Sequence, residues 1–233
     1  MKLTAHDIAR KIDASVLKFD TSLDLVDQML DACKKYDIGC CFAMPCFSEY
    51  LSKKLKGTNT ELGTSLSFPS GQGTTEFKVH EAEYFMSLGA DQVDMVMNVG
   101  WLKQGWYDKV AEDIKAVRKA TEGTSMKVII EAMLLTDEEI TTASKIVMDC
   151  GANFVKSGTG FSPDPTTVHH VEVMKAAVGD GCRIKVAGGI RDLKTLLLMN
   201  DAGAERFGIG LAASIKIIED AMKYPDGVEA SML

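Results

Sequence analysis

Short runs rich in β-branched and aromatic residues alternate with longer amphipathic stretches along the whole chain. This alternation is typical of repeated βα units, in which each strand is followed by a helix that covers one face of a sheet. In the longer stretches apolar residues recur three and four positions apart, as at Val110, Ile114 and Val117. Eight strands are predicted: Ile12–Val16, Ile38–Phe42, Leu62–Phe68, Gln92–Met97, Lys127–Ala132, Asn153–Lys156, Arg183–Ala187 and Glu205–Gly208.

Helix boundaries follow the same rhythm. Thr136 and Glu139 have the spacing of a capping box. Asp164-Pro165 predicts an N-cap with proline at the first helical position, and Asp192 predicts another N-cap. Three predicted helices end in glycine and alanine just before a strand, where glycine permits a left-handed turn: residues 89–91, 151–153 and 203–205.

The length of the chain limits how these units are arranged. A chain of 233 residues without a proline-rich or low-complexity linker is within the size range of one α/β barrel. Eight βα units therefore predict a single (β/α)8 TIM barrel domain over residues 1–233. A doubly wound open sheet is the alternative, although no G-x-G-x-x-G motif follows an early strand.

Four charged residues interrupt strands that should be almost continuously apolar in a parallel barrel. They are Asp94, Glu131, Lys156 and Lys185, each in or at the carboxyl-terminal half of its predicted strand. Barrel active sites are built at this end of the strands. Two readings stay open, because buried ion pairs also occur where no chemistry takes place: a structural ion-pair network and a catalytic site.

The two lysines favour the catalytic reading. Lys156 and Lys185 are expected on neighbouring strands, near the same end. At an effective dielectric constant of about 20, two ammonium groups ~4 Å apart repel by about 4 kcal/mol, or roughly three pKa units. The pKa of one lysine would then fall to about 7.5, which makes its neutral amine available to attack a carbonyl. We expect Lys156 to be the nucleophile, Lys185 the perturbing cation and Asp94 the acid/base partner.

Glycine-rich turns follow both lysine strands. The turns "SGTG" and "AGGIR" offer exposed backbone N–H groups, and Arg191 adds a positive charge. In barrels the loops near the last strands often bind phosphate. The glycines therefore predict an anion site, or they serve the geometry of the βα turns alone.

Charge and composition exclude several classes of partner. The net charge is −7, and lysines and arginines are scattered, which argues against a nucleic-acid or anionic-membrane surface. No apolar run approaches the ~18 residues needed to span a bilayer, and the first residues lack the apolar core of a signal peptide. We predict a cytoplasmic protein in which most cysteines are reduced core thiols.

Metal binding is not expected. His169 and His170 are adjacent, so on a helix they point about 100° apart, and no second ligand cluster accompanies them. Cys40, Cys41 and Cys46 lack the paired C-x-x-C spacing of a zinc site. We predict no metal and no cofactor.

Four motifs in order resemble the deoxyribose-phosphate aldolase family of class I aldolases. They are "VDMVMNVG", "KVIIEAMLLTDEEI", "FVKSGTGFS" and "KVAGGIRD", and the resemblance extends from "IDASVLK" to the last predicted helix. It implies reversible, metal-free cleavage of 2-deoxyribose 5-phosphate into acetaldehyde and glyceraldehyde 3-phosphate. By position, Lys156 would form the Schiff base, Lys185 would be the auxiliary lysine and Asp94 the proton-relay acid.

The resemblance also implies residues that bind the substrate. Four glycines match phosphate-site positions of the family: Gly160, Gly188, Gly189 and Gly208. Three further residues match positions that line the family's active site: Asp13, Ser15 and Cys41. The resemblance leaves open whether the chain forms a homodimer or a higher homo-oligomer.

The chain departs from the family pattern at three places. Ser157-Gly158 replaces Thr-Ser after the Schiff-base lysine, and Gly210-Leu211 replaces a pair of serines after strand eight. Each lost hydrogen bond to a charged group is worth roughly 1.5–3 kcal/mol, so phosphate preference is expected to be weakened or shifted. The family's C-terminal tyrosine is not evident, since Tyr224 is well short of the last residue. Proton delivery would then depend on Asp94, Lys185 and water.

Two other classes of function stay open on the sequence. One is a sugar-phosphate-binding barrel that has lost catalysis, suggested by the altered phosphate loops. The other is a different enzyme on the same scaffold, such as a transaldolase or a metal-free isomerase. The joint presence of Lys156, Lys185 and Asp94 argues against the first class.

Overall fold

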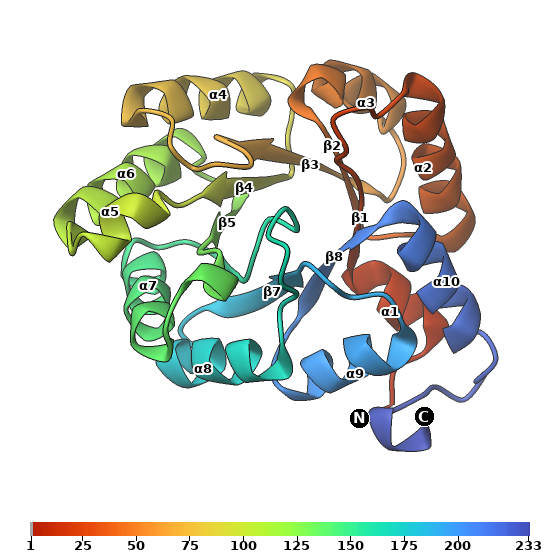
Figure 1. The fold of residues 1–233 in the computed structure, drawn as a ribbon. Helices are drawn as coiled ribbons and strands as arrows, with labels where there is room; N and C mark the ends of the chain where they lie inside the picture. The colour runs from red at the N-terminus through yellow and green to blue at the C-terminus, as the bar shows by residue number, and fades with distance from the viewer. Residues whose placement is uncertain (1) are drawn as a thin grey trace.

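Eight parallel strands form a closed barrel in the computed structural model, which describes residues 2–233 (Figure 1). Each strand pairs with its neighbours in chain order, and the last pairs with the first. The strands are β1 (Ile12–Val16), β2 (Cys40–Ala43), β3 (Glu61–Leu66), β4 (Gln92–Val96), β5 (Ser125–Ile129), β6 (Phe154–Lys156), β7 (Arg183–Ala187) and β8 (Arg206–Gly210). The predicted (β/α)8 barrel is confirmed, and the open sheet is excluded.

Helices surround the barrel on its outside (Figure 1). One helix follows each strand to the next: α2 (Leu23–Tyr36), α3 (Ser48–Lys54), α4 (Thr75–Ser87), α6 (Tyr107–Ala120), α7 (Asp137–Asp149), α8 (Val168–Val178), α9 (Leu193–Asp201) and α10 (Leu211–Ala221). Two short helices are additional: α1 (Ala5–Lys11) before β1 and α5 (Val99–Lys103) after β4. The remaining elements are 3₁₀ turns: η1 (Pro45–Phe47), η2 (Ala132–Leu134) and η3 (Ala230–Met232).

Most of the predicted boundary signals are present in the structure. Thr136 and Glu139 form the capping box of α7, and Asp192 caps α9. The glycines at 89, 151 and 203 all have positive φ, which confirms the left-handed turns before β4, β6 and β8.

One predicted helix start is wrong. The helix expected at Asp164-Pro165 begins instead at Val168, where Thr167 and His170 form a capping box. The chain before it is not helical: the Thr166 hydroxyl donates to the Ala187 carbonyl over 2.8 Å, which ties this segment to β7.

Side chains on the strands alternate between two layers. The outward layer packs against the helices in one hydrophobic core, to which Ala14, Val93 and Val155 belong. The inward layer fills the barrel and is mostly polar or charged, with Asp13 and Asp94 among its members. The polar side chains in these apolar strands therefore face the barrel interior.

None of the helices within residues 2–233 is long and apolar enough to cross a membrane.

Candidate active site

Three lysine ammonium groups converge on one carboxylate inside the barrel. Lys156 and Lys185 both donate to Asp94 Oδ2, over 2.8 and 2.7 Å, so their nitrogens are no farther apart than the sum of these distances. Lys127 Nζ lies 3.3 Å from Asp94 Oδ1. The pairing of β6 with β7 places Lys156 directly opposite Lys185, as the sequence predicted for adjacent strands. All four side chains are buried.

A second carboxylate holds Lys185 from the other side. Asp13 Oδ2 lies 2.5 Å from Lys185 Nζ, and Asp13 Oδ1 accepts from Arg206 Nε over 2.9 Å. Lys185 is therefore placed between two carboxylates, while Lys156 has one. Because of this difference, the pKa values of the two amines shift in opposite directions.

The Lys156 amine is the more easily deprotonated of the two. Burial lowers the pKa of Lys156 to about 8, Asp94 opposes this shift, and the charge of Lys185 adds to it. Lys185 alone was expected to lower this pKa, but burial is the larger cause and the neighbouring cation contributes less. A usable fraction of the Lys156 amine is neutral near pH 7.

Lys185 and Asp94 are held in their charged forms. Burial disfavours the Lys185 cation, but Asp13 and Asp94 more than offset this and raise the pKa of Lys185. Burial would likewise raise the pKa of Asp94, but Lys156, Lys185 and Lys127 hold it far below its ordinary value. Asp94 is thus an ionised acceptor at neutral pH rather than a protonated acid.

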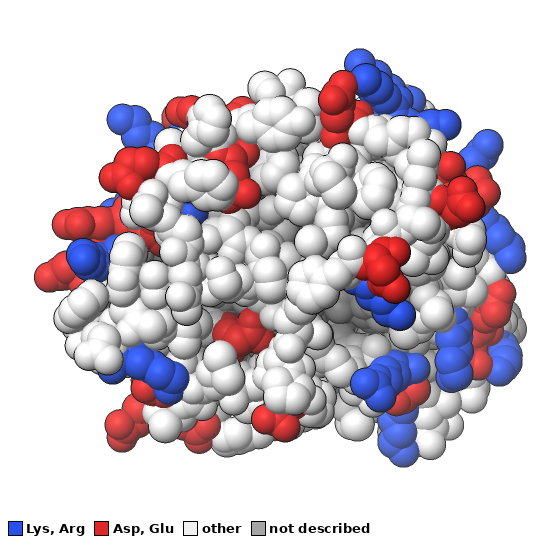
Figure 2. Space-filling view, turned by 45° about the horizontal axis from the view of Figure 1, so that its top comes forward, with Lys and Arg blue, Asp and Glu red and all other residues white. Residues whose placement is uncertain are grey.

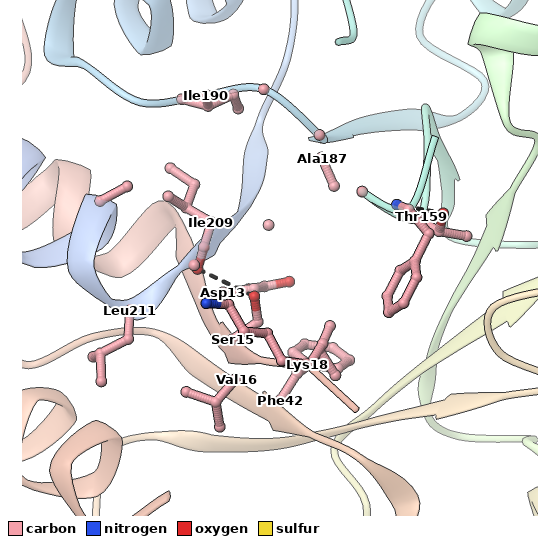
Figure 3. A pocket seen from close by; sticks show the side chains of 18 of the residues that line it. Asp13, Ser15, Val16, Lys18, Phe42, Thr159, Ala187, Ile190, Ile209 and Leu211 are labelled. Carbon is pink, nitrogen blue, oxygen red and sulfur yellow. Dashed lines mark hydrogen bonds between the residues drawn. The ribbon is translucent and has the colours of Figure 1, made fainter. Parts of the chain in front are cut away.

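A cavity of about 910 Å³ opens above the two lysines at the carboxyl-terminal end of the strands. Figure 3 shows side chains from several strands and loops around it, among them Ser15, Phe42, Thr159 and Leu211. Lys156 and Lys185 are both part of its wall. On this side of the molecule, Lys, Arg, Asp and Glu gather mainly toward the rim (Figure 2). A small molecule that enters the cavity can reach the Lys156 amine.

The predicted glycine turns lie together in the wall of this cavity. Gly160, Gly188 and Gly189 all have positive φ, and a Cβ on Gly188 would lie 3.6 Å from the Gly160 Cα. Gly208 lies on β8, where a Cβ would come within 3.0 Å of Ala187 and 3.4 Å of Lys185 Cε. The first three glycines shape the turns, and Gly208 leaves room for the Lys185 side chain.

The other predicted contact residues are placed differently from one another. Asp13 and Ser15 line the cavity, and the Ser15 hydroxyl donates to the Ile209 carbonyl over 3.3 Å. Cys41 does not line it: the free thiol is fully buried in the hydrophobic core, and the neighbouring Cys33 thiol on α2 together with burial raises the pKa of Cys41. The expectation that Cys41 lines the site is corrected, because odd and even residues of β2 face opposite sides and Phe42 takes the inward position.

Glu131 lies outside the lysine network. The strand predicted through Ala132 ends at Ile129, and Glu131 follows it with a φ of 52°. Its buried carboxylate accepts the Thr159 N–H over 3.1 Å. Glu131 therefore fixes the turn that follows Lys156 and has no ion pair with the lysines.

Sequence reasoning missed two members of the network. Lys127 stands at the start of a predicted strand, yet it is fully buried and donates to Gln92. Arg206 was not singled out, although it pairs with Asp13. The available signal was the polar residue at each of these inward positions, in strands that should be apolar.

The wall after β8 lacks hydroxyl groups. Gly210, Leu211, Ala212 and Ala213 all line the cavity there. Helix α10 begins at Leu211 without a side-chain cap, so its first backbone N–H groups are not used by a capping side chain. Lys18 and Arg191 also line the cavity. An anion at this wall would meet backbone N–H groups and these two cations.

Within residues 2–233, no group of three His, Cys, Asp or Glu side chains is arranged to hold a metal ion. His169 lies 2.9 Å from Asp137 at the surface, in a pair between α8 and the start of α7.

Comparison with known proteins places these features in a family. Residues 10–218 match the DeoC/LacD family aldolase model. Over 213 residues the chain is 41% identical to a deoxyribose-phosphate aldolase of Staphylococcus carnosus, covering 91% of this chain and 96% of that protein.

Two solved structures share the barrel. One is an aldolase named QR15, with a TM-score of 0.88 and 32% identity, covering 93% of this chain and 96% of that one. The other is a deoxyribose phosphate aldolase from Aeropyrum pernix described as tetrameric, with a TM-score of 0.85 and 26% identity, covering 93% and 92% of the two chains.

Proposed function

The chain belongs to the DeoC/LacD family of aldolases, and from this premise we propose that it cleaves 2-deoxyribose 5-phosphate reversibly into acetaldehyde and glyceraldehyde 3-phosphate. The observation that carries the proposal is the state and position of the Lys156 amine. Its pKa is lowered to about 8, and it lies in the wall of a cavity large enough for a sugar phosphate.

The proposed reaction starts from the neutral Lys156 amine. The amine attacks the C1 aldehyde of the open-chain substrate, and loss of one water together with uptake of one proton leaves a protonated imine. The C2–C3 bond then breaks: its electron pair forms the enamine, and the C3 hydroxyl loses a proton as glyceraldehyde 3-phosphate is released. The enamine gains a proton at C2, and water then releases acetaldehyde and the free amine.

We assign the proton transfers to Lys185 and water. Lys185 keeps its proton because two carboxylates face it, so it is a proton donor within reach of the Lys156 nitrogen. Asp94, held ionised, orients both amines through one oxygen. In this assignment Asp94 orients the amines, whereas the resemblance implied that it is the proton-relay acid.

Trapping with a reductant tests the proposal. Incubation with acetaldehyde and borohydride is expected to add one two-carbon unit at Lys156, measured by mass spectrometry of peptides. Lys156→Ala should abolish the label. Lys78→Met is the matched control, since Lys78 is also a buried lysine paired with an aspartate. Unlabelled wild-type protein would instead favour a barrel that binds sugar phosphates without catalysis.

A second candidate function is an aldolase of this type with a weakened phosphate preference. It is favoured by the wall after β8, where Gly210 and Leu211 supply no hydroxyl. We expect the ratio of kcat/KM for phosphorylated and unphosphorylated deoxyribose to be modest, and a ratio of many thousandfold would refute this candidate.

Restoring the hydroxyls sharpens that test. Each hydrogen bond to a charged group is worth about 1.5–3 kcal/mol, so the Gly210→Ser/Leu211→Ser variant should raise the ratio by about 10²-fold or more. Leu211→Ala is the matched control, because it removes bulk from the same wall without adding a donor. An equal gain in the control would show that space rather than hydrogen bonding limits phosphate binding.

We also propose that residues 1–233 act as one domain that assembles with copies of itself in the cytoplasm. The tetrameric relative from Aeropyrum pernix supports self-assembly. Six free cysteines suit a reducing compartment. The net charge of −7 does not favour nucleic acid as a partner. Light scattering of the purified chain would give the number of subunits.

A further inference from the structure

The Phe42 ring occupies the interior of the barrel beneath the cavity. Phe42 is 3% exposed and lines the cavity from β2 (Figure 3). Its ring takes the space that a side chain at position 63 would need: a Cβ on Gly63 would lie 2.2 to 2.6 Å from three ring atoms. The Phe42 ring on β2 therefore fits only because position 63 on β3 is a glycine.

All three lysines of the network lie near this ring. Lys185 Nζ is 4.2 Å from the ring centroid, Lys127 Nζ is 5.9 Å away, and Lys156 Nζ is 6.0 Å away. A cation within about 6 Å of a ring face is attracted to it, and the attraction weakens with distance. The ring thus stabilises the Lys185 cation most, and for Lys156 it chiefly replaces water.

Charged or titratable side chains lie on the inward side of every other strand. They are Asp13 on β1, Cys40 on β2, Glu61 on β3, Asp94 on β4, Lys127 on β5, Lys185 on β7 and Arg206 on β8. Of these, Asp94 and Asp13 favour a charged Lys156, and Lys185 disfavours it. The Phe42 ring lies within 6.0 Å of all three lysine nitrogens and also lines the cavity, so it is the apolar side chain placed between the cavity and these cations.

We propose that Phe42 is a positioning residue, whose ring excludes water from the lysine network and thereby keeps the Lys156 amine in its attacking form. The inference rests on the proposed role of Lys156 as the nucleophile. It goes beyond that role by naming the group that makes the amine reactive.

The experiment measures how fast acetaldehyde and cyanoborohydride label Lys156 between pH 6 and pH 10, in wild type, Phe42→Ala and Phe42→Leu. Alanine leaves space for water beside the cations, so the midpoint of the labelling profile should rise by about one pH unit. Labelling at pH 7 should then be roughly tenfold slower. Leucine keeps an apolar side chain there, so its midpoint should stay close to that of wild type.

Phe154→Leu is the matched control. Phe154 is a buried phenylalanine on β6 whose ring lies 5.5 Å from Lys127 Nζ and 4.1 Å from the Arg183 guanidinium carbon. It does not line the cavity described above. Its substitution should leave the midpoint of Lys156 labelling unchanged.

A second pair of variants covers the case in which Phe42→Ala does not fold. Gly63→Ala alone should displace the ring and lower both thermal stability and labelling at pH 7. The Gly63→Ala/Phe42→Val variant should recover thermal stability. Its labelling midpoint should lie above that of wild type, because valine is smaller than the Phe42 ring and lets water reach the lysines.

The outcomes separate the inference from the proposed function. If wild type is labelled at Lys156 but the alanine and valine variants keep its midpoint, the inference is overturned and the proposed function stands. If wild type is not labelled at Lys156, both are overturned.

Discussion

Two buried lysine–aspartate pairs in this molecule differ in what surrounds them. Lys78 on α4 lies 2.6 Å from Asp113 on α6, between two helices outside the barrel. Lys156 on β6 lies 2.8 Å from Asp94 on β4, inside the barrel. Each of the four side chains is at most 5% exposed. Burial lowers the pKa of both lysines.

The partners of the two aspartates are different. Within residues 2–233, Asp113 is paired with one cation, and its other oxygen accepts the Thr75 hydroxyl over 2.8 Å. Asp94 is shared by three lysines. In the first pair one cation balances one carboxylate. Around Asp94 the three lysines carry more positive charge than its carboxylate can offset alone.

Access to the two lysines also differs. Lys78 donates to the Val96 carbonyl over 3.2 Å and does not line the cavity above the barrel. Lys156 lines that cavity. Burial and an ion pair are therefore common to both lysines. What distinguishes Lys156 is the excess of cations around its carboxylate and its position in the cavity wall.

Replacing the two lysines should separate them most clearly in activity. We expect Lys156→Ala to lower kcat for deoxyribose 5-phosphate cleavage by at least ~10⁴-fold, because the covalent step is lost. Lys78→Met should keep kcat per folded molecule within about threefold, since it touches no reacting atom. Steady-state kinetics on both variants measures this. A comparable loss in the Lys78 variant would end the distinction between the two pairs.

Stability should respond in the opposite order. Lys78→Met leaves Asp113 buried without a cation, which is expected to cost about 3–5 kcal/mol in free energy of unfolding. Lys156→Met leaves Asp94 with two lysines. These two cations still offset the Asp94 carboxylate, so the substitution should change the free energy of unfolding by less than about 1 kcal/mol. Urea unfolding would show whether the two costs are instead equal.

The pH profile of kcat/KM should change when a lysine near Asp94 is replaced and stay the same when Lys78 is replaced. In wild type kcat/KM should rise with pH through about 8, as Lys156 loses its proton. Lys185→Leu removes a neighbouring cation, so the acid limb should move up by about one pH unit. Lys78→Met should leave the limb in place. An unmoved limb in the Lys185 variant would show that the two amines do not interact.

The smallest expected effect is the loss of one hydrogen bond in the helix pair. Thr75→Val removes the hydroxyl that donates to Asp113, at an expected cost of about 1.5 kcal/mol in free energy of unfolding, the lower end for a hydrogen bond to a charged group, with the pH profile unchanged. Thermal unfolding and the kcat/KM profile measured on one sample would test both parts. A shifted profile would mean that the helix pair communicates with the barrel.

The barrel could be predicted because its signals are local. The strands Ile12–Val16 and Arg183–Ala187 were predicted to the residue, since each is a short run bounded by helix or turn signals. Boundaries were missed where distant pairing decides them. The run Lys127–Ala132 reads as one strand, but β5 ends at Ile129, and its neighbour β6 has three residues. The sequence of β5 alone contains no sign of that limit.

The site could be predicted only in part. Lys156, Lys185 and Asp94 stand out as charges in apolar strands, and the structure brings them together, while their catalytic roles stay predictions. Lys127 begins an apolar run, where a lysine is usually solvated, and its burial depends on Gln92 and Asp94 of the adjacent strand. The ring of Phe42 was missed because its place depends on the glycine at position 63.

The contact between Asp13 and Arg206 joins the first strand to the last across 193 positions of the chain. Asp13 also holds Lys185, so the surroundings of Lys156 are complete only when β8 closes against β1. A nascent chain that is still emerging from the ribosome therefore carries lysines of ordinary basicity. The lowered pKa of Lys156 is a property of the closed barrel, and before closure this amine has no advantage over the other lysines of the chain.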